Sequence, residues 1–114
     1  HCGVRDIVVG TGHPGFRSVL ALGREGIATV KLSSLFRVSK MLAGFDDLDP
    51  YVDELLKAFG VNGCIWGSDW PFINVPRRPI YADLLPPLSR WLPDPADRAR
   101  VLAHNPRRLF GFAN

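Results

Sequence analysis

Apolar residues along this chain alternate between helical spacing and short extended runs. From 14 to 23 they recur at helical spacing after a proline, and Gly26 is placed to end that helix. Residues 27–33 are rich in β-branched side chains and finish on small polar ones, which predicts a strand. Residues 1–13 are glycine-rich and irregular. The pattern thus opens with a loop, a helix and a strand.

The second predicted helix carries the clearest start and stop signals. Asp49 can accept hydrogen bonds from the free amide groups of the first turn, and Pro50 suits the first helical position. Gly60 is placed to end the helix, and residues 63–68 then form a second predicted strand. A helix-strand pair therefore occurs twice in succession.

The last third of the chain is predicted to be helical throughout. Residues 81–92 show helical spacing but contain Pro86 and Pro87, so either one helix kinks there or a new helix starts at Pro86. Asp94 is placed to cap a further helix through about residue 104, and Asn105 begins one last turn. We expect three apolar residues of that last turn to dock on the core as a plug: Leu109, Phe110 and Phe112.

This order of elements requires parallel strands joined by right-handed crossovers, which is the α/β class. Two strands, plus whatever strand His1 terminates, cannot close a parallel barrel, which takes eight strands and typically about 250 residues. We therefore expect residues 1–114 to form a single partial domain, about the last three βα units of a (β/α)8 TIM barrel. A start on His1 rather than Met is typical of a truncated or excised piece.

Composition excludes some function classes and leaves an ordinary globular domain. The net charge of +3 comes from scattered arginines, whereas nucleic-acid binders gather such charge on one face, so no nucleic-acid partner is expected. No run is long and apolar enough for a membrane span, and no leader is visible, which favours a cytoplasmic protein. Cys2 and Cys64 are expected to be reduced and buried.

The residues most suggestive of chemistry are 64–71, Cys-Ile-Trp-Gly-Ser-Asp-Trp-Pro. They describe a buried strand that ends on a carboxylate, and the carboxyl ends of parallel strands are where α/β proteins place their sites. Asp69 is therefore a candidate catalytic residue, with opening of a tight turn as the alternative. Burial by Trp66 and Trp70 would raise the pKa of Asp69. Trp70 is expected either to line the pocket or to pack at the rim of the barrel.

Four segments together resemble the C-terminal part of the amidohydrolase-related (amidohydrolase 2) TIM-barrel hydrolases. They are residues 1–3, residues 30–39, residues 64–71 and residues 105–112. The similarity is greatest to the lactonase branch that includes 2-pyrone-4,6-dicarboxylate lactonase. The resemblance implies a hydrolase that opens a lactone or related cyclic ester, with a carboxylated lactone as substrate.

The resemblance also implies roles for individual residues. Asp69 matches an aspartate that handles the proton of the attacking water and binds metal where one is present. His1 matches a histidine at the end of barrel strand 6, and Arg37 matches an arginine that holds a substrate carboxylate. The family's other metal ligands lie upstream of this chain, so the complete enzyme is expected to use either a divalent metal such as zinc or none.

Each of these residues also has a simpler interpretation. His1 could be a frayed chain end, and Arg37 could pair on the surface with Asp46 or Asp47. Lys31, inside a strand, is expected to reach a carboxylate at the strand end. The alternative function is a non-catalytic remnant whose exposed strand edge associates with another chain. As an enzyme, the isolated piece is expected to be inactive, because a barrel site draws on the earlier strands.

Overall fold

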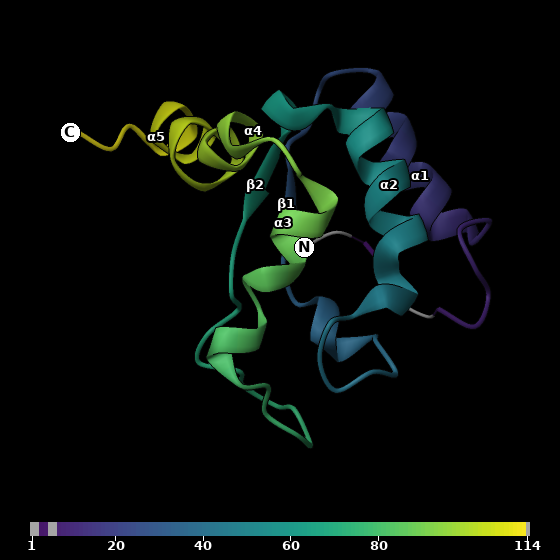
Figure 1. The fold of residues 1–114 in the computed structure, drawn as a ribbon. Coiled ribbons are helices and arrows are strands. Elements are labelled where there is room, and N and C mark those ends of the chain that lie inside the picture. Colours follow the sequence, from purple (N-terminus) through teal and green to yellow (C-terminus); the bar gives the residue numbers. More distant parts are fainter. Residues whose placement is uncertain (1–2, 5–6, 114) are drawn as a thin grey trace.

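Two short strands pair in parallel at the centre of the molecule. The computed structural model describes residues 3–4 and 7–113, and within them β1 (Val30–Leu32) and β2 (Cys64–Trp66) form a two-stranded sheet (Figure 1). The register pairs Val30 with Cys64 and Leu32 with Trp66. This confirms the predicted parallel pairing of two strands joined through a helix.

Both strands are shorter than the sequence predicts. The amide of Ile27 bonds to the carbonyl of Leu22 at the end of the preceding helix, so the residues before Val30 remain attached to that helix. At the other end, Ser34 adopts a left-handed conformation with φ 60° and turns the chain away from β2. A bond back to the preceding helix at one end and a turn at the other thus limit β1 to three residues.

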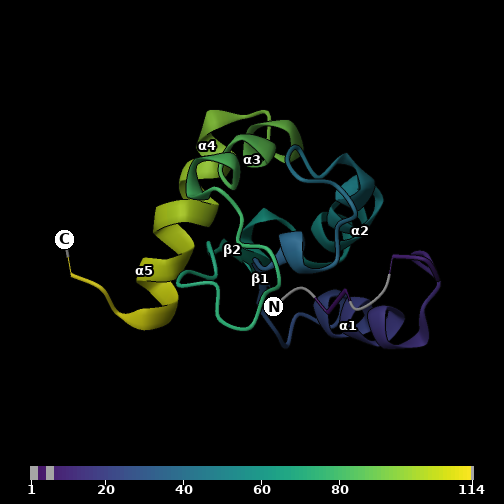
Figure 2. The same ribbon diagram turned by 90° about the horizontal axis from the view of Figure 1, so that it is seen from below.

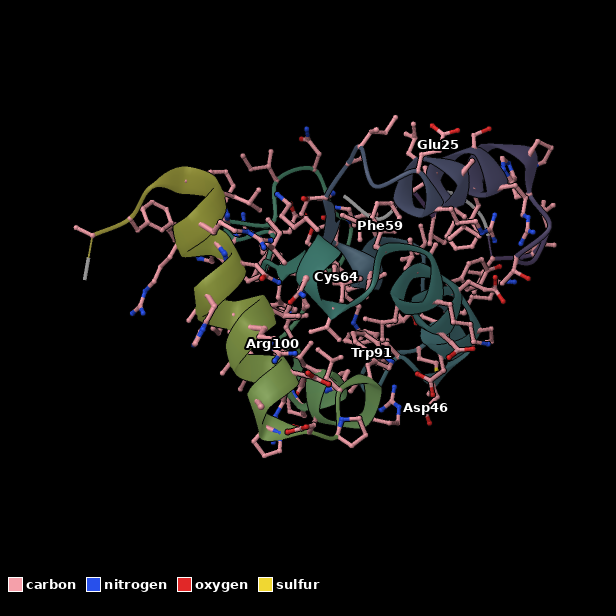
Figure 3. The ribbon with its side chains drawn as sticks, turned by 90° about the horizontal axis from the view of Figure 1, so that it is seen from above. Glu25, Asp46, Phe59, Cys64, Trp91 and Arg100 are labelled. Carbon is pink, nitrogen blue, oxygen red and sulfur yellow. The ribbon has the colours of Figure 1, made fainter. Side chains whose placement is uncertain are left out.

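Two helices cover one side of the sheet. α1 (Pro14–Arg24) and α2 (Asp49–Phe59) lie side by side, and Gly26 and Gly60, both with positive φ, follow their last turns as predicted (Figures 1 and 2). The contact between them depends on Gly23, because a Cβ there would lie 2.6 Å from Cδ2 of Phe59. Figure 3 shows Phe59 at this contact. A larger side chain at residue 23 would force the Phe59 ring to shift.

The remaining helices pack beside β2 and α2. They are α3 (Pro86–Trp91), α4 (Pro95–Ala99), a π-helical turn over Arg100–His104 and α5 (Asn105–Phe110). α3 starts at Pro86, which resolves the open question in favour of a new helix over a kinked one. Asp94 caps α4 as predicted, with its Oδ1 accepting from the Ala96 amide at 2.8 Å. No helix in the described part of the chain is long and apolar enough to cross a membrane.

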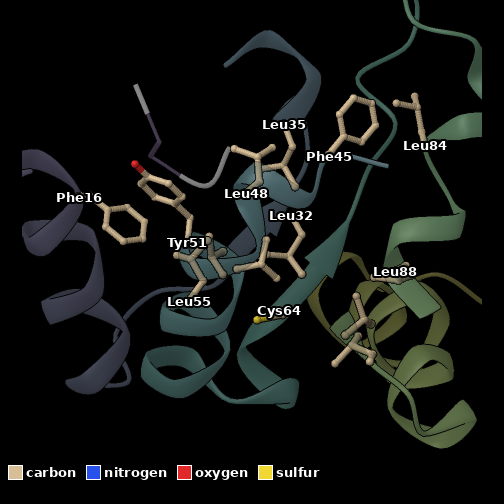
Figure 4. Close-up of a cluster of buried hydrophobic side chains, with 14 of the residues drawn as sticks. Phe16, Leu32, Leu35, Phe45, Leu48, Tyr51, Leu55, Cys64, Leu84 and Leu88 are labelled. Atoms are coloured by element: carbon tan, nitrogen blue, oxygen red, sulfur yellow. The ribbon is translucent and has the colours of Figure 1, made fainter. Parts of the chain in front are cut away.

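The hydrophobic core runs from α1 through the sheet to α3. Phe16 and Tyr51 meet edge to face at 5.3 Å on the α1 side, and Leu88 closes the core on the α3 side (Figure 4). Cys64 lies at the centre, fully buried and unpaired, and burial raises the pKa of its thiol to about 12. This confirms a reduced, buried Cys64, while Cys2 lies outside the described residues.

Asp49 does not cap α2 as the sequence predicts. It is the first helical residue, and its carboxylate instead accepts hydrogen bonds from Arg90 and from Nε1 of Trp91, the latter at 2.7 Å. Burial alone would raise the pKa of Asp49, but the hydrogen bonds from Arg90 and Trp91 and the charge of Arg90 outweigh it, so the pKa lies below its ordinary value. Asp49 therefore joins α2 to α3.

The predicted apolar plug at the end of α5 is wrong. Leu109, Phe110 and Phe112 are 43%, 61% and 61% exposed. After Gly111, with φ 69°, the chain leads away from the sheet, as the C-terminal end in Figure 1 shows. Helical periodicity at 105–112 indicated a helix correctly, but periodicity alone does not determine whether the apolar side of that helix faces the core.

α5 is instead anchored by a polar residue, Asn105. Its side chain is buried, and its amide nitrogen donates to the carbonyls of Val61 and Cys64, each at 2.8 Å. One of these carbonyls belongs to β2 itself, so the amide group holds the start of α5 against the sheet. A buried side-chain amide that donates to two carbonyls stabilises the fold by more than the area it buries would suggest, because both carbonyls would otherwise lack a hydrogen-bond donor.

We predict that Asn105→Asp destabilises the protein by at least about 3 kcal/mol, because it places a buried carboxylate oxygen against two carbonyl oxygens. Urea unfolding measures the loss, which should shrink at acidic pH as the new carboxyl group takes up a proton. The matched control is Asn62→Asp, at an exposed position, which should leave the midpoint nearly unchanged. Equal effects of the two changes would contradict the anchoring role.

Candidate functional site

The candidate site lies where the two strands end. The loop 33–48 follows β1 and the loop 67–85 follows β2, and both leave the same, lower end of the sheet in Figure 1. Figure 2 views the molecule from that end. The rings of Phe36 and Phe72, one from each loop, meet edge to face at 5.5 Å. Parallel pairing thus brings together two segments more than thirty residues apart.

An ion pair between Asp69 and Arg37 forms the centre of the site. Nε of Arg37 donates to Oδ2 of Asp69 at 2.7 Å, and the two side chains are 32% and 18% exposed. Nη2 of Arg37 also donates to the carbonyl of Ile73 at 2.9 Å. Arg37 does not pair with Asp46 or Asp47 among the described residues, because Asp46 binds Arg90 and Asp47 accepts from Ser39 and from the Lys40 amide.

The backbone on both sides of this pair is turned tightly. Asp69 has φ 65° and the peptide bond between Trp70 and Pro71 is cis. Aspartate tolerates the left-handed region better than most residues. Arg37 lies on a short 3₁₀ turn, Leu35–Arg37, which follows the left-handed Ser34. The left-handed turns at Ser34 and Asp69 leave the two side chains facing each other across the ends of the strands.

The pKa of Asp69 is lowered, contrary to the expected rise from burial by Trp66 and Trp70. Burial does act to raise it, but the hydrogen bonds from Arg37 and Ser34 and the charges of Arg37 and Lys31 outweigh burial. Trp70, which was expected to bury Asp69, is itself 71% exposed. Asp69 is therefore an ionised carboxylate at neutral pH and is able to accept a proton.

Ser34 is the site residue that sequence reasoning missed. It hydrogen-bonds to Asp69 and also lines a narrow hollow between the strand ends. The hollow includes Ser33, Ser68 and Trp66 in its lining and has room for roughly one water molecule. The available signal was a pair of small hydroxyl residues directly after a strand, at the same edge as Asp69.

Lys31 lies on β1 close enough to lower the pKa of Asp69 by its charge, in agreement with its expected direction toward a strand-end carboxylate. Gly67 makes room for it, because a Cβ at Gly67 would lie 3.2 Å from Cδ of Lys31. Lys31 is half-buried and thus adds positive potential without a direct ion pair to Asp69 in the described structure.

Trp70 and His1 are the other two predicted site residues. Trp70 lines an open hollow together with Phe72, Arg78 and Tyr81 rather than a closed pocket. His1 lies outside the described residues, so its predicted role stays a prediction. His13, expected to be a surface residue, has a local role, since its Nδ1 accepts from the Gly15 amide at the start of α1.

The described residues do not by themselves form a metal site. No group of three His, Cys, Asp or Glu side chains among them could hold a metal ion. Oδ2 of Asp69, a candidate ligand at the strand ends, already accepts a hydrogen bond from Arg37. A metal in the complete barrel would need further ligands from outside the described part of this chain.

Comparison with known proteins identifies the family. The model of the amidohydrolase family matches residues 1–112. 4-Sulfomuconolactone hydrolase from Rhizobium radiobacter is 32% identical over 114 residues, which cover 97% of this chain and 38% of that protein. D-galactarolactone isomerase from Agrobacterium fabrum is 28% identical over 103 residues, covering 88% of this chain and 35% of that protein.

A solved structure shows the same fold. The chain superposes with a TM-score of 0.77 and 25% identity on a Pseudomonas putida protein assigned as a 2-pyrone-4,6-dicarboxylic acid hydrolase, covering 96% of this chain and 40% of that one. The chain therefore belongs to the amidohydrolase family and folds as part of a TIM barrel, as the sequence predicted. It spans about two fifths of the length of the relatives it matches.

The ion pair leads to a prediction about the pKa of Asp69. Arg37→Gln removes the arginine's hydrogen bond, the largest influence that lowers the pKa of Asp69, together with its charge, while burial remains, so the pKa of Asp69 should rise. Carbon-13 NMR titration of the side-chain carboxyl groups measures it. Arg24→Gln, on the exposed end of α1, is the matched control and should leave Asp69 unchanged. An unaltered pKa in the Arg37 variant would show that the pair is not formed in solution.

Proposed function

We propose that the protein containing this chain hydrolyses a lactone or related cyclic ester, with Asp69 accepting the proton of the attacking water. The observation that supports this most directly is the Asp69–Arg37 pair at the strand ends, at 2.7 Å and beside a water-sized hollow. Membership of the amidohydrolase family and similarity to a sulfomuconolactone hydrolase favour the same reaction.

In the proposed reaction, the oxygen of water attacks the lactone carbonyl carbon while Asp69 takes up the water's proton. The bond from the carbonyl carbon to the ring oxygen then breaks, and the proton on Asp69 returns to the departing alkoxide. The product is an open hydroxy acid, so atoms and charges balance. Family members commonly use a metal, which would polarise the carbonyl in a complete barrel. His1 is proposed to act near the same carbonyl.

Arg37 is proposed to hold the substrate while it positions Asp69. A guanidinium group has five N–H donors, and in the described structure Arg37 commits one to Asp69 and one to the Ile73 carbonyl. The remaining donors can bind a substrate carboxylate in a planar, bidentate fashion. Arg37 can thus contact both the base and an anionic substrate.

Asp69→Asn in the full-length protein should reduce lactone hydrolysis by about 10²–10⁴-fold, because the amide cannot accept the water's proton. Folding should be little affected, and the acid limb of the pH profile of kcat/KM should disappear. Asp53→Asn, at an exposed carboxylate of α2 paired with Lys57, is the matched control. Wild-type activity with an unchanged pH limb would show that Asp69 only shapes the turn.

Arg37→Met should lower kcat/KM for a carboxylated lactone by about 10- to 100-fold, mainly through KM, because charge-assisted hydrogen bonds to the substrate are lost. For an uncharged lactone, KM should stay unchanged. Only the acid limb of the pH profile of kcat/KM should move, to higher pH, because the pKa of Asp69 rises. Steady-state kinetics with both substrates tests this. Equal KM losses for both would assign Arg37 to the fold rather than to binding.

Lactone isomerisation is the second candidate function, because D-galactarolactone isomerase is among the relatives. Both reactions would start at the same lactone carbonyl. Turnover in water labelled with oxygen-18 separates them, since hydrolysis places one labelled oxygen in the product carboxylate and a direct rearrangement places none.

A further inference from the structure

Lys31 is the residue of β1 that does not point into the hydrophobic core. Its neighbours Val30 and Leu32 are both buried there, and Figure 4 shows Leu32 within that core. The register partner of Lys31 on β2 is Ile65, which also lies outside the core cluster. Successive side chains of a strand point to opposite faces, so Lys31 and Ile65 share the face turned away from this core. In a complete barrel, that face is the interior.

The side chain of Lys31 leans along the strands toward their carboxyl ends. A Cβ at Gly67, which follows Ile65 on the same face, would lie 3.2 Å from Cδ and 3.7 Å from Cγ of Lys31. The methylene stem of Lys31 therefore crosses over Gly67, where no side chain blocks it. Its charge acts on Asp69, further along the same segment. The ammonium group is thus directed to the strand ends, where barrel enzymes bind their substrates.

The half-buried ammonium group of Lys31 has no hydrogen bond or direct ion pair with another described residue. Arg37, another cation beside Asp69, already donates to that carboxylate and to the carbonyl of Ile73. A partly buried ammonium group without a partner costs stability, so a lysine with a purely structural role is expected to be paired. The three N–H donors of Lys31 are available to a ligand instead.

Lactone hydrolysis places negative charge on the carbonyl oxygen of the substrate. When water adds to the carbonyl carbon, the π electron pair of the carbonyl moves onto that oxygen, and Asp69 takes up the water's proton. The roles proposed for Asp69 and Arg37 supply no cation for this oxygen. Fixed donors aimed at such a developing charge are usually the largest single contribution to the rate of an enzyme.

We propose that the ammonium group of Lys31 binds the carbonyl oxygen of the lactone from the barrel interior and stabilises the negative charge that develops there. This inference rests on the proposed lactone hydrolysis and adds a catalytic residue to it. Lys31 keeps its proton throughout the reaction. The electron pair on the oxygen re-forms the carbonyl as the bond to the ring oxygen breaks, and the proton held by Asp69 passes to the departing alkoxide.

The first test measures steady-state kinetics of the full-length protein on a carboxylated lactone. Lys31→Met keeps the length of the side chain and removes its charge, so kcat should fall about 100-fold with KM within about threefold, as for the loss of one oxyanion donor. The matched control is Lys57→Met, at an exposed lysine of α2 that pairs with Asp53, and it should change neither constant. An unchanged kcat in Lys31→Met, or an equal loss in the control, overturns the inference.

A second variant, Lys31→Ala, separates the charge of the side chain from its packing. Propylammonium added to this variant replaces the missing charge and should raise kcat at least about tenfold, once the reaction without protein is subtracted. 1-Propanol has a similar size and no charge, and it should restore nothing. Failure of propylammonium to raise kcat, or equal rescue by both compounds, overturns the inference.

The outcomes also separate this inference from the proposed function. If Lys31→Met only shifts the acid limb of the pH profile and leaves kcat unchanged on the plateau above it, Lys31 acts through Asp69 alone. That result overturns the inference and leaves the proposed function standing. If the unaltered protein turns over no lactone at all, the proposed function is overturned and this inference with it.

Discussion

The parallel pairing of β1 with β2 is the constraint on which the rest of this structure depends. It is only three residues long in each strand, yet it brings the loops that carry Arg37 and Asp69 to one edge. Parallel strands need a crossover between them, and α2 supplies it while burying the sheet with α1. Without the pairing, nothing would hold the loop that carries Arg37 next to the loop that carries Asp69.

Polar residues fix the helices around that sheet where apolar packing alone would leave their positions open. Asn105 bonds the start of α5 to β2, and Asp49 bonds α2 to α3 through Arg90 and Trp91. Apolar contacts are not directional, whereas each of these bonds has one geometry that satisfies it. The core therefore supplies most of the stabilisation, and these bonds determine the orientation of the helices.

In the proposed mechanism, the pair formed by Asp69 and Arg37 links substrate charge to catalysis. With Arg37 bound, the pKa of Asp69 is low, which keeps the carboxylate ionised but makes it a weak base. An anionic substrate that shares the guanidinium of Arg37 adds negative charge beside Asp69 and so acts to raise its pKa. Binding an anionic lactone would thereby make Asp69 a stronger base toward the attacking water.

The sequence by itself determined the local features, because helix starts, helix ends and strand ends depend on neighbouring residues. Pro14 and Gly26 bound the first helix, and Asp69 follows a strand as predicted. Only the tertiary structure decided which partners distant residues take: Asp69 for Arg37, and Arg90 with Trp91 for Asp49. It likewise decided that the pKa of Asp69 falls and that Phe110 is exposed, since both depend on groups brought together from separate parts of the chain.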